Sequence, residues 1–150
     1  MKKKRFKTNS AVFAIILDEK QKHILLQKRS NTGCKDGFYD LGTAGHVDGD
    51  ESMKQALQRE LVEEIGINVE LDDLIPSSFM HVKYGEGDFY YNGYFMVKKY
   101  TGTPTIVEPD KNAELKWFPI HELPENIIPD RKVGIDNYLN DVHYSEIGWE

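Results

Sequence analysis

The hydrophobic pattern of the chain predicts several β-strands. Two early apolar runs, residues 10–17 and 23–29, are joined by a five-residue polar turn, which is typical of a hairpin. The same criteria predict further strands over residues 68–74, 77–84, 88–98 and 114–118. Residues 88–98 carry aromatic side chains on both faces, so we expect a central strand whose rings lie mostly in the core.

A helical period replaces the strand pattern in two places. The first predicted helix begins around Ser52, with Asp50 or Glu51 as its N-terminal cap, and ends at Gly66. A second amphipathic helix is predicted over residues 130–139. The intervening segments rich in Gly, Pro, Asp and Asn are predicted as loops.

Length and charge limit what kind of protein this is. The chain has 150 residues, so we expect one domain over residues 1–150. Its formal charge of −6 argues against general nucleic-acid binding, and the basic cluster at residues 2–7 is expected to be a solvated terminus. The apolar run 11–17 is too short to span a membrane, and the single Cys34 cannot form an internal disulfide. We therefore expect a cytoplasmic protein without a membrane partner.

The acidic residues of the first helix suggest a site for a cation. Glu60, Glu63 and Glu64 are three and four residues apart, so they project from one side of the helix. Like charges at this spacing destabilise a helix by about 0.2–0.5 kcal/mol per pair, and a hard divalent cation reverses that cost. The alternative interpretation is a solvated acidic face.

A longer pattern distinguishes these alternatives. Its fixed residues are Gly45, Glu51, Arg59, Glu60, Leu61, Glu63, Glu64, Gly66 and Ile67. These match every fixed position of the Nudix box, so the chain resembles the Nudix hydrolases. The resemblance implies an α/β fold, an α/β/α sandwich with a mixed central β-sheet. It also implies an Mg²⁺-dependent, or Mn²⁺-dependent, hydrolase of nucleoside diphosphates linked to another group X.

The resemblance also implies roles for individual residues. The expected metal ligands are three side chains and one backbone carbonyl: Glu60, Glu63, Glu64 and Gly45. Glu60 is the usual candidate for the general base, and Arg59 is expected to orient a carboxylate through a charge-assisted hydrogen bond. Glu51 either supports the metal site or only caps the helix.

Residues outside the box are candidates for binding the substrate. A basic residue at the end of the second strand often faces the phosphates, and we favour Arg29 over Lys28 because a guanidinium grips a phosphate in bidentate fashion. Glu108 and Glu114 are candidates for an additional acid, either a metal ligand or the general base. Asp130 belongs to the segment that corresponds to a base-binding motif of the superfamily, and the alternative interpretation is that it caps the second helix.

The expected reaction is substitution by water at phosphorus, with a small-molecule nucleotide as substrate. A nucleoside triphosphate giving the monophosphate and pyrophosphate is favoured, because the chain is short and lacks an N-terminal extension. ADP-ribose or nucleotide-sugar hydrolysis, and a non-catalytic nucleotide or ADP-ribose sensor, remain alternatives. An isomerase branch of the superfamily uses a Cys where this chain has Ala44, which favours hydrolysis. The sequence leaves both a monomer and a homodimer open.

Overall fold

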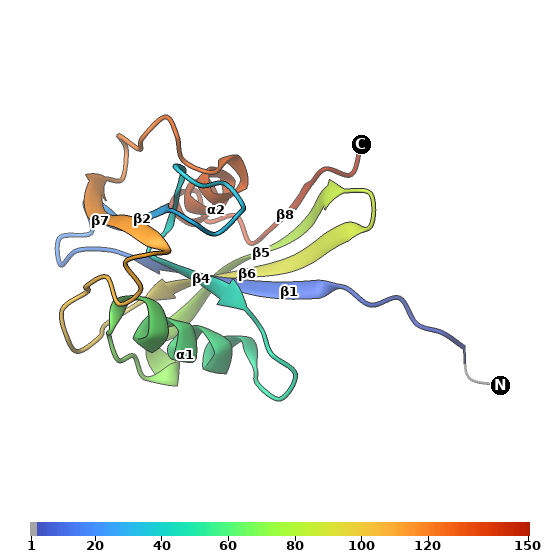
Figure 1. Cartoon of the computed structure of the whole chain (residues 1–150), viewed down its shortest axis with the longest axis horizontal. Helices are drawn as coiled ribbons and strands as arrows, with labels where there is room; N and C mark the ends of the chain where they lie inside the picture. The colour runs from blue at the N-terminus through green and yellow to red at the C-terminus, as the bar shows by residue number, and fades with distance from the viewer. Residues whose placement is uncertain (1–2) are drawn as a thin grey trace.

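The computed structural model describes residues 3–150, which form two β-sheets and two α-helices (Figure 1). The strands are β1 (Asn9–Ile16), β2 (His23–Arg29), β3 (Tyr39–Leu41), β4 (Thr43–His46), β5 (Leu74–Gly85), β6 (Asp88–Val97), β7 (Asn112–Pro119) and β8 (Tyr144–Ile147). The helices are α1 (Met53–Ile65), α2 (Pro129–Leu139) and the short 3₁₀ turn η1 (Leu71–Asp73). Of the basic N-terminal cluster, Lys2 lies outside the described residues and residues 3–7 are exposed.

The larger sheet is mixed, as expected. Its order is β4-β1-β6-β5-β8, with β1–β6 and β5–β8 parallel and the other pairs antiparallel. The smaller sheet, β3-β2-β7, is antiparallel. Strand β6 lies between β1 and β5, which confirms its predicted central position. The division of the strands into two sheets was not predicted. The hairpin expected from the two early runs is therefore wrong, because β1 and β2 lie in different sheets and pair only at the single bridge between Leu17 and Ile24.

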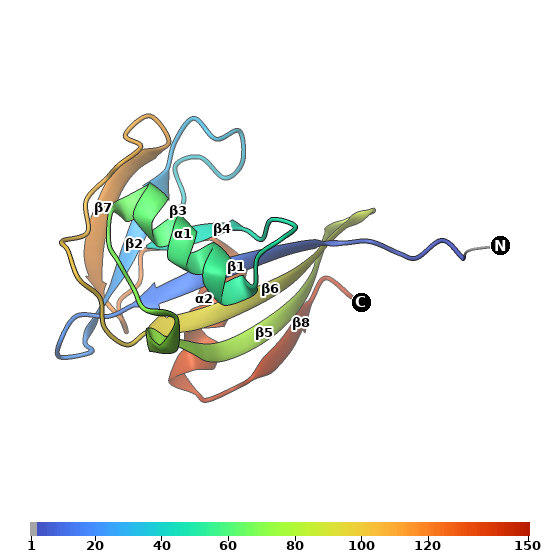
Figure 2. The same ribbon diagram turned by 90° about the horizontal axis from the view of Figure 1, so that it is seen from below.

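The two helices cover opposite faces of the larger sheet (Figure 2). Four buried residues of α1, Ala56, Leu57, Leu61 and Ile65, pack on alternate residues of β1 and β6. On the other face, Ile135 of α2 belongs to a cluster with Phe13 and Tyr94. Alternate residues of the same strands therefore point into the two apolar clusters, one on each face of the sheet. The α/β/α arrangement is confirmed.

Helix α1 begins and ends at well-defined caps. Ser52 accepts a hydrogen bond from the backbone N–H of Gln55, whose side chain accepts one from the backbone N–H of Ser52. The prediction that Asp50 or Glu51 caps the helix is therefore wrong. Gly66 ends the helix in the left-handed region, at φ 70°, as predicted.

The strand prediction fails where pairing depends on distant segments. The strand expected over residues 68–74 is instead a single bridge between Asn68 and Thr101 followed by η1. In the other direction, β8 was not predicted, because a short exposed strand is stabilised only by pairing with β5. No helix within residues 3–150 combines the length and the apolarity that crossing a membrane requires.

One prediction concerns the contact between α2 and the sheet. A Cβ at Gly134 would fall on the ring of Tyr94, which is only 1% exposed and cannot move aside. Gly134→Ala gains about 0.5–1 kcal/mol of helix propensity but overpacks a full core, which costs about 1–3 kcal/mol. We expect a net loss of about 1–2 kcal/mol in the free energy of unfolding, measured by urea denaturation.

Gly49→Ala is the matched control, because a Cβ there meets no atom within 4 Å. It should change the free energy of unfolding by less than about 0.5 kcal/mol. Equal effects of the two substitutions would contradict the packing between α2 and Tyr94.

Candidate active site

A cavity of about 750 Å³ is lined by residues of α1, of the strands β1, β2, β4, β5 and β6, and of the start of α2. Six of the residues expected at the site line it: Arg29, Gly45, Glu60, Glu64, Glu108 and Asp130. Five others do not: Lys28, Glu51, Arg59, Glu63 and Glu114. The fold therefore separates the candidates that line the cavity from those that do not.

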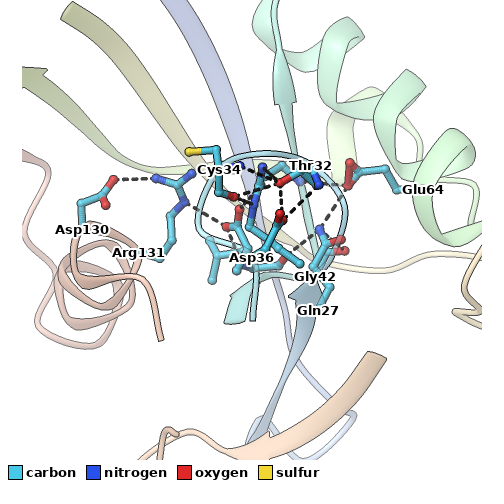
Figure 3. A network of polar contacts seen from close by, with 12 residues as sticks. Gln27, Thr32, Cys34, Asp36, Gly42, Glu64, Asp130 and Arg131 are labelled. Carbon is cyan, nitrogen blue, oxygen red and sulfur yellow. Dashed lines mark hydrogen bonds and ion pairs between the residues drawn. The ribbon is translucent and has the colours of Figure 1, made fainter. Parts of the chain in front are cut away.

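Glu64 is the most constrained carboxylate of the cavity. One of its oxygens, Oε1, accepts hydrogen bonds from Gln27 Nε2 and from the backbone N–H of Ala44, each at 3.2 Å. Figure 3 shows Gln27 of β2 pointing toward Glu64 of α1. Burial raises the pKa of Glu64 to about 8, although both hydrogen bonds act in the opposite direction.

Glu60 lies one turn earlier on the same face of α1. Burial raises the pKa of its carboxyl group, and a hydrogen bond from Arg59 opposes that rise. The Glu60 side chain passes so close to the backbone of Gly45 that a Cβ at this position would fall on the carboxylate. Glycine is therefore required here to bring β4 against the acidic face of α1.

Arg59 connects the acids that lie outside the cavity with one that lies inside. Its guanidinium donates to Glu51 Oε1 at 2.6 Å, to Glu60 Oε1 at 2.8 Å and to Glu63 Oε2 at 3.2 Å. Arg59 in turn lowers the pKa of Glu51 to about 2. Arg59 thus keeps Glu51 ionised beside the cavity and forms an ion pair with Glu63, which remains exposed.

The acidic face of α1 has suitable donors for a cation, but its side chains do not yet have the geometry of a metal site. Within residues 3–150, no group of three or more acidic, His or Cys side chains already has the geometry to hold a metal ion. Yet the carboxylates of Glu60 and Glu64 are largely buried. Among residues 3–150, Glu64 forms no ion pair with a cationic side chain. Hard oxygen donors beside a glycine that permits close approach fit a divalent cation.

A second polar network borders the cavity through Arg29, Asp130 and Arg131. Asp40 is fully buried and accepts from Arg29 at 3.1 Å and from Arg131 at 2.9 Å. Arg131 also donates to Asp130 at 2.6 Å, and the Tyr84 hydroxyl donates to the same carboxylate at 2.7 Å. Figure 3 shows this network continuing toward the loop that carries Thr32 and Asp36.

Asp40 and Arg131 were not identified from the sequence. Burial alone lowers the pKa of Arg131, but Asp40 and Asp130 outweigh it, so the pKa lies well above its usual range. Arg131 follows Asp130 directly and was therefore within a motif already under consideration. Asp40 carried no such signal, since only the packing of β3 against α2 shows that it is buried.

Asp130 does not cap α2. The N-terminal cap is Ile128, without a side-chain hydrogen bond, and Asp130 instead binds Tyr84 and Arg131. The interpretation of Asp130 as a helix cap is therefore wrong.

Lys28 and Glu114 lie on the side of β2 and β7 that faces away from the cavity. The Lys28 ammonium lies 5.8 Å from the centre of the Tyr39 ring, and the Tyr39 hydroxyl donates to Glu114 at 2.9 Å. Arg29 is one residue further along β2 and lines the cavity. Three of its N–H groups are used by Asp40, Thr32 and the carbonyl of Cys34, which leaves two for a ligand.

Comparisons with known proteins agree on one family. The model of the NUDIX domain family matches residues 7–138. A protein of Bacillus subtilis (strain 168) named "Putative 8-oxo-dGTP diphosphatase" is 32% identical over 128 residues, which cover 85% of this chain and 78% of that protein. RNA pyrophosphohydrolase of Erythrobacter litoralis (strain HTCC2594) is 29% identical over 104 residues, 59% of this chain and 63% of that protein.

The fold has relatives among solved structures. The MutT NUDIX hydrolase from Burkholderia pseudomallei superimposes with a TM-score of 0.77 at 25% identity, covering 88% of this chain and 98% of that structure. The E. coli ORF135 protein gives a TM-score of 0.74 at 25% identity, covering 89% of this chain and 90% of that structure.

The raised pKa of Glu64 predicts how stability depends on pH in the metal-free protein. The unfolded chain releases this proton near pH 4.5 and the folded protein near pH 8. Between these values the folded state binds more protons, so its stability falls as pH rises. Glu64→Gln removes this titration, and the variant should gain stability relative to the wild type from pH 5 to pH 9.

The measurement is urea denaturation at pH 5, 7 and 9 in the presence of a chelator. A stability difference between wild type and Glu64→Gln that stays constant across these values would show that Glu64 is not buried as described.

Proposed function

The chain belongs to the Nudix family, and from this membership we propose that it is an Mg²⁺-dependent pyrophosphohydrolase. Members of the family act on phosphoric anhydride bonds. The proposed substrate is a nucleoside diphosphate linked to another group, most favourably a nucleoside triphosphate that yields the monophosphate and pyrophosphate. The observation that carries the proposal is the convergence of Glu60, Glu64 and Gly45 on one cavity.

Glu60 and Glu64 would hold the metal ion, with the carbonyl of Gly45 as a further oxygen donor. Nudix hydrolases generally use divalent metals, and Mg²⁺ suits a site made of carboxylate and carbonyl oxygens. When bound, the ion neutralises phosphate charge and acts as a Lewis acid on the diphosphate. Glu63 is exposed and bonded to Arg59, which supports a contribution through water.

Arg29 would position the phosphates. Its guanidinium is fixed by Asp40 and by the loop at Thr32 and Cys34, and its remaining N–H groups are available to a phosphate oxygen. A donor held in place before the substrate arrives loses little freedom on binding, so it aligns the phosphate for attack at low entropic cost.

We propose that the general base, which takes the proton from the attacking water, is one of the acids that line the cavity. Glu60 and Glu108 both line it, whereas Glu114 hydrogen-bonds with Tyr39 on the far side of β7. Glu60 accepts a hydrogen bond from Arg59, which favours its ionised form. Of the two downstream acids, Glu108 is therefore the one we propose as a partner or rival of Glu60.

The names of two relatives guide the choice of substrate. The relative named as an 8-oxo-dGTP diphosphatase favours a nucleoside triphosphate, and the relative named as an RNA pyrophosphohydrolase extends the choice to RNA. Asp130 lines the cavity, but its carboxylate is already bonded to Tyr84 and Arg131. ADP-ribose and nucleotide sugars remain the alternatives.

A substrate screen tests the proposal. With Mg²⁺ present, we expect the wild type to hydrolyse nucleoside triphosphates, 8-oxo-dGTP included, faster than ADP-ribose, nucleotide sugars or dinucleoside polyphosphates. Glu64→Gln should lower the rate about 100-fold or more, because it removes a charged metal ligand. Glu19→Gln, an exposed substitution of the same kind, should leave the rate unchanged.

Phosphate and pyrophosphate release report turnover, and circular dichroism checks that the variants are folded. Folded Glu64→Gln with a wild-type rate would overturn the metal-site assignment. Tight nucleotide binding without turnover of any compound in the screen would identify a sensor rather than an enzyme.

A second prediction separates the two downstream acids. Glu108→Gln should lower kcat about 100-fold if Glu108 takes the proton or binds metal at the cavity. Glu114→Gln should change kcat by less than about twofold, because its carboxylate contacts Tyr39 outside the cavity. Steady-state kinetics at saturating Mg²⁺ measure both, and the reverse order of effects would reassign the acid to Glu114.

A further inference from the structure

Arg131, at the start of α2, combines three features that a merely structural arginine does not need. Its side chain is buried to 13% exposure, its guanidinium lies over the ring of Phe13, and it lines the cavity. We propose that the guanidinium of Arg131 is the platform on which the nucleobase of the substrate stacks. This inference rests on the proposed function, since it assigns a residue to the nucleoside half of the same substrate.

The edges of the guanidinium are fixed by anions. Nε donates to Asp40 at 2.9 Å, and Nη1 donates to Asp130 at 2.6 Å and to the Tyr84 hydroxyl at 3.2 Å. Hydrogen bonds to a guanidinium lie in its plane, so these partners set the orientation of the plane. Figure 3 shows Arg131 held on one side by Asp130 and bonded on the other toward the centre of the network.

Because its hydrogen bonds lie in its plane, the two faces of the guanidinium can only be contacted by stacking groups. The Cζ atom lies 4.2 Å from the centre of the Phe13 ring, so an aromatic side chain occupies one face. Phe13 is itself stacked on Tyr94, with ring centres 4.8 Å apart and planes inclined by 22°. Phe13 is therefore fixed beneath Arg131. Because Arg131 lines the cavity, we assign the other face of its guanidinium to the ligand.

Asn92 supports the proposal independently, because one of its buried polar atoms has no hydrogen-bond partner among residues 3–150. Its side chain is fully buried in the cavity wall, and Nδ2 donates to the Tyr84 hydroxyl at 3.3 Å. Its Oδ1 has no hydrogen-bond partner among residues 3–150. A buried acceptor without a partner costs free energy, which a ligand donor recovers.

These observations define the chemistry of the ligand. A planar, electron-rich ring stacks on a guanidinium face, as bases do on arginine in other nucleotide sites. An amino or imino N–H on the edge of that ring would supply the donor for Asn92. Arg131 thus acts on the base, whereas the acids of α1 act on the diphosphate.

The test compares ligands with and without a base. In the presence of Mg²⁺, the affinities of guanosine 5′-monophosphate and ribose 5-phosphate are measured by calorimetry for wild type, Arg131→Met and Arg131→Lys. We expect the wild type to prefer the nucleotide by about tenfold or more. Both variants should lose most of that preference, because lysine keeps the charge but not the plane. Their affinity for ribose 5-phosphate should stay within about threefold of wild type.

Tyr84→Phe is the matched control. It removes one edge contact of Arg131 but leaves both carboxylates in place, so the preference for the nucleotide should persist. Either Arg131 variant, folded and still preferring the nucleotide to the wild-type extent, would overturn the proposal.

A ligand substitution covers the case in which the Arg131 variants do not fold. Wild-type protein should bind uridine 5′-monophosphate more tightly than 5,6-dihydrouridine 5′-monophosphate, whose saturated ring is not planar. Equal affinities would overturn the stacking. A base preference without any turnover contradicts the proposed function alone, whereas turnover without a base preference contradicts this inference alone.

Discussion

Enclosing carboxylates in protein requires either a cationic partner or a higher pKa, and this constraint organises the cavity. Asp40 is completely buried and forms ion pairs with Arg29 and Arg131, which come from distant parts of the chain. Glu64 is enclosed without such a partner, and its pKa is raised to about 8. The charge of Asp40 is therefore balanced by the protein itself, whereas Glu64 would be stabilised by the divalent cation that we propose.

The same electrostatic arrangement connects the parts of the fold. Arg131 ties α2 to β3, and Arg59 ties the acids of α1 to the loop before it. Gly45 allows β4 to approach Glu60 closely, so that the acidic face of α1 borders the cavity instead of bulk water. The apolar clusters on both faces of the larger sheet hold these elements in register.

The local pattern predicted much of this architecture. Both helices, the two early strands and the central position of β6 follow from apolar periodicity and from Gly66, which are properties of neighbouring residues. The hairpin expected between the two early strands was wrong, because β1 and β2 find their partners in different sheets. The strand expected over residues 68–74 was wrong because its apolar residues find no continuous partner strand. The expected α/β/α arrangement came from the Nudix box, and so did the interpretation of the acids of α1 as metal ligands.

Tertiary structure alone decided which polar residues meet. The sequence by itself determined where the acids of α1 lie, because i, i+3 and i+4 spacing in a helix is a local property. It could not show that Asp40 and Arg131 meet, since they are 91 residues apart and neither stands out in composition. It also could not separate Glu108 from Glu114. Glu108 lies in the loop before β7, whereas Glu114 lies on β7, and the direction in which each faces depends on how β7 pairs with β2. Long-range burial and pairing, which no local pattern encodes, made those choices.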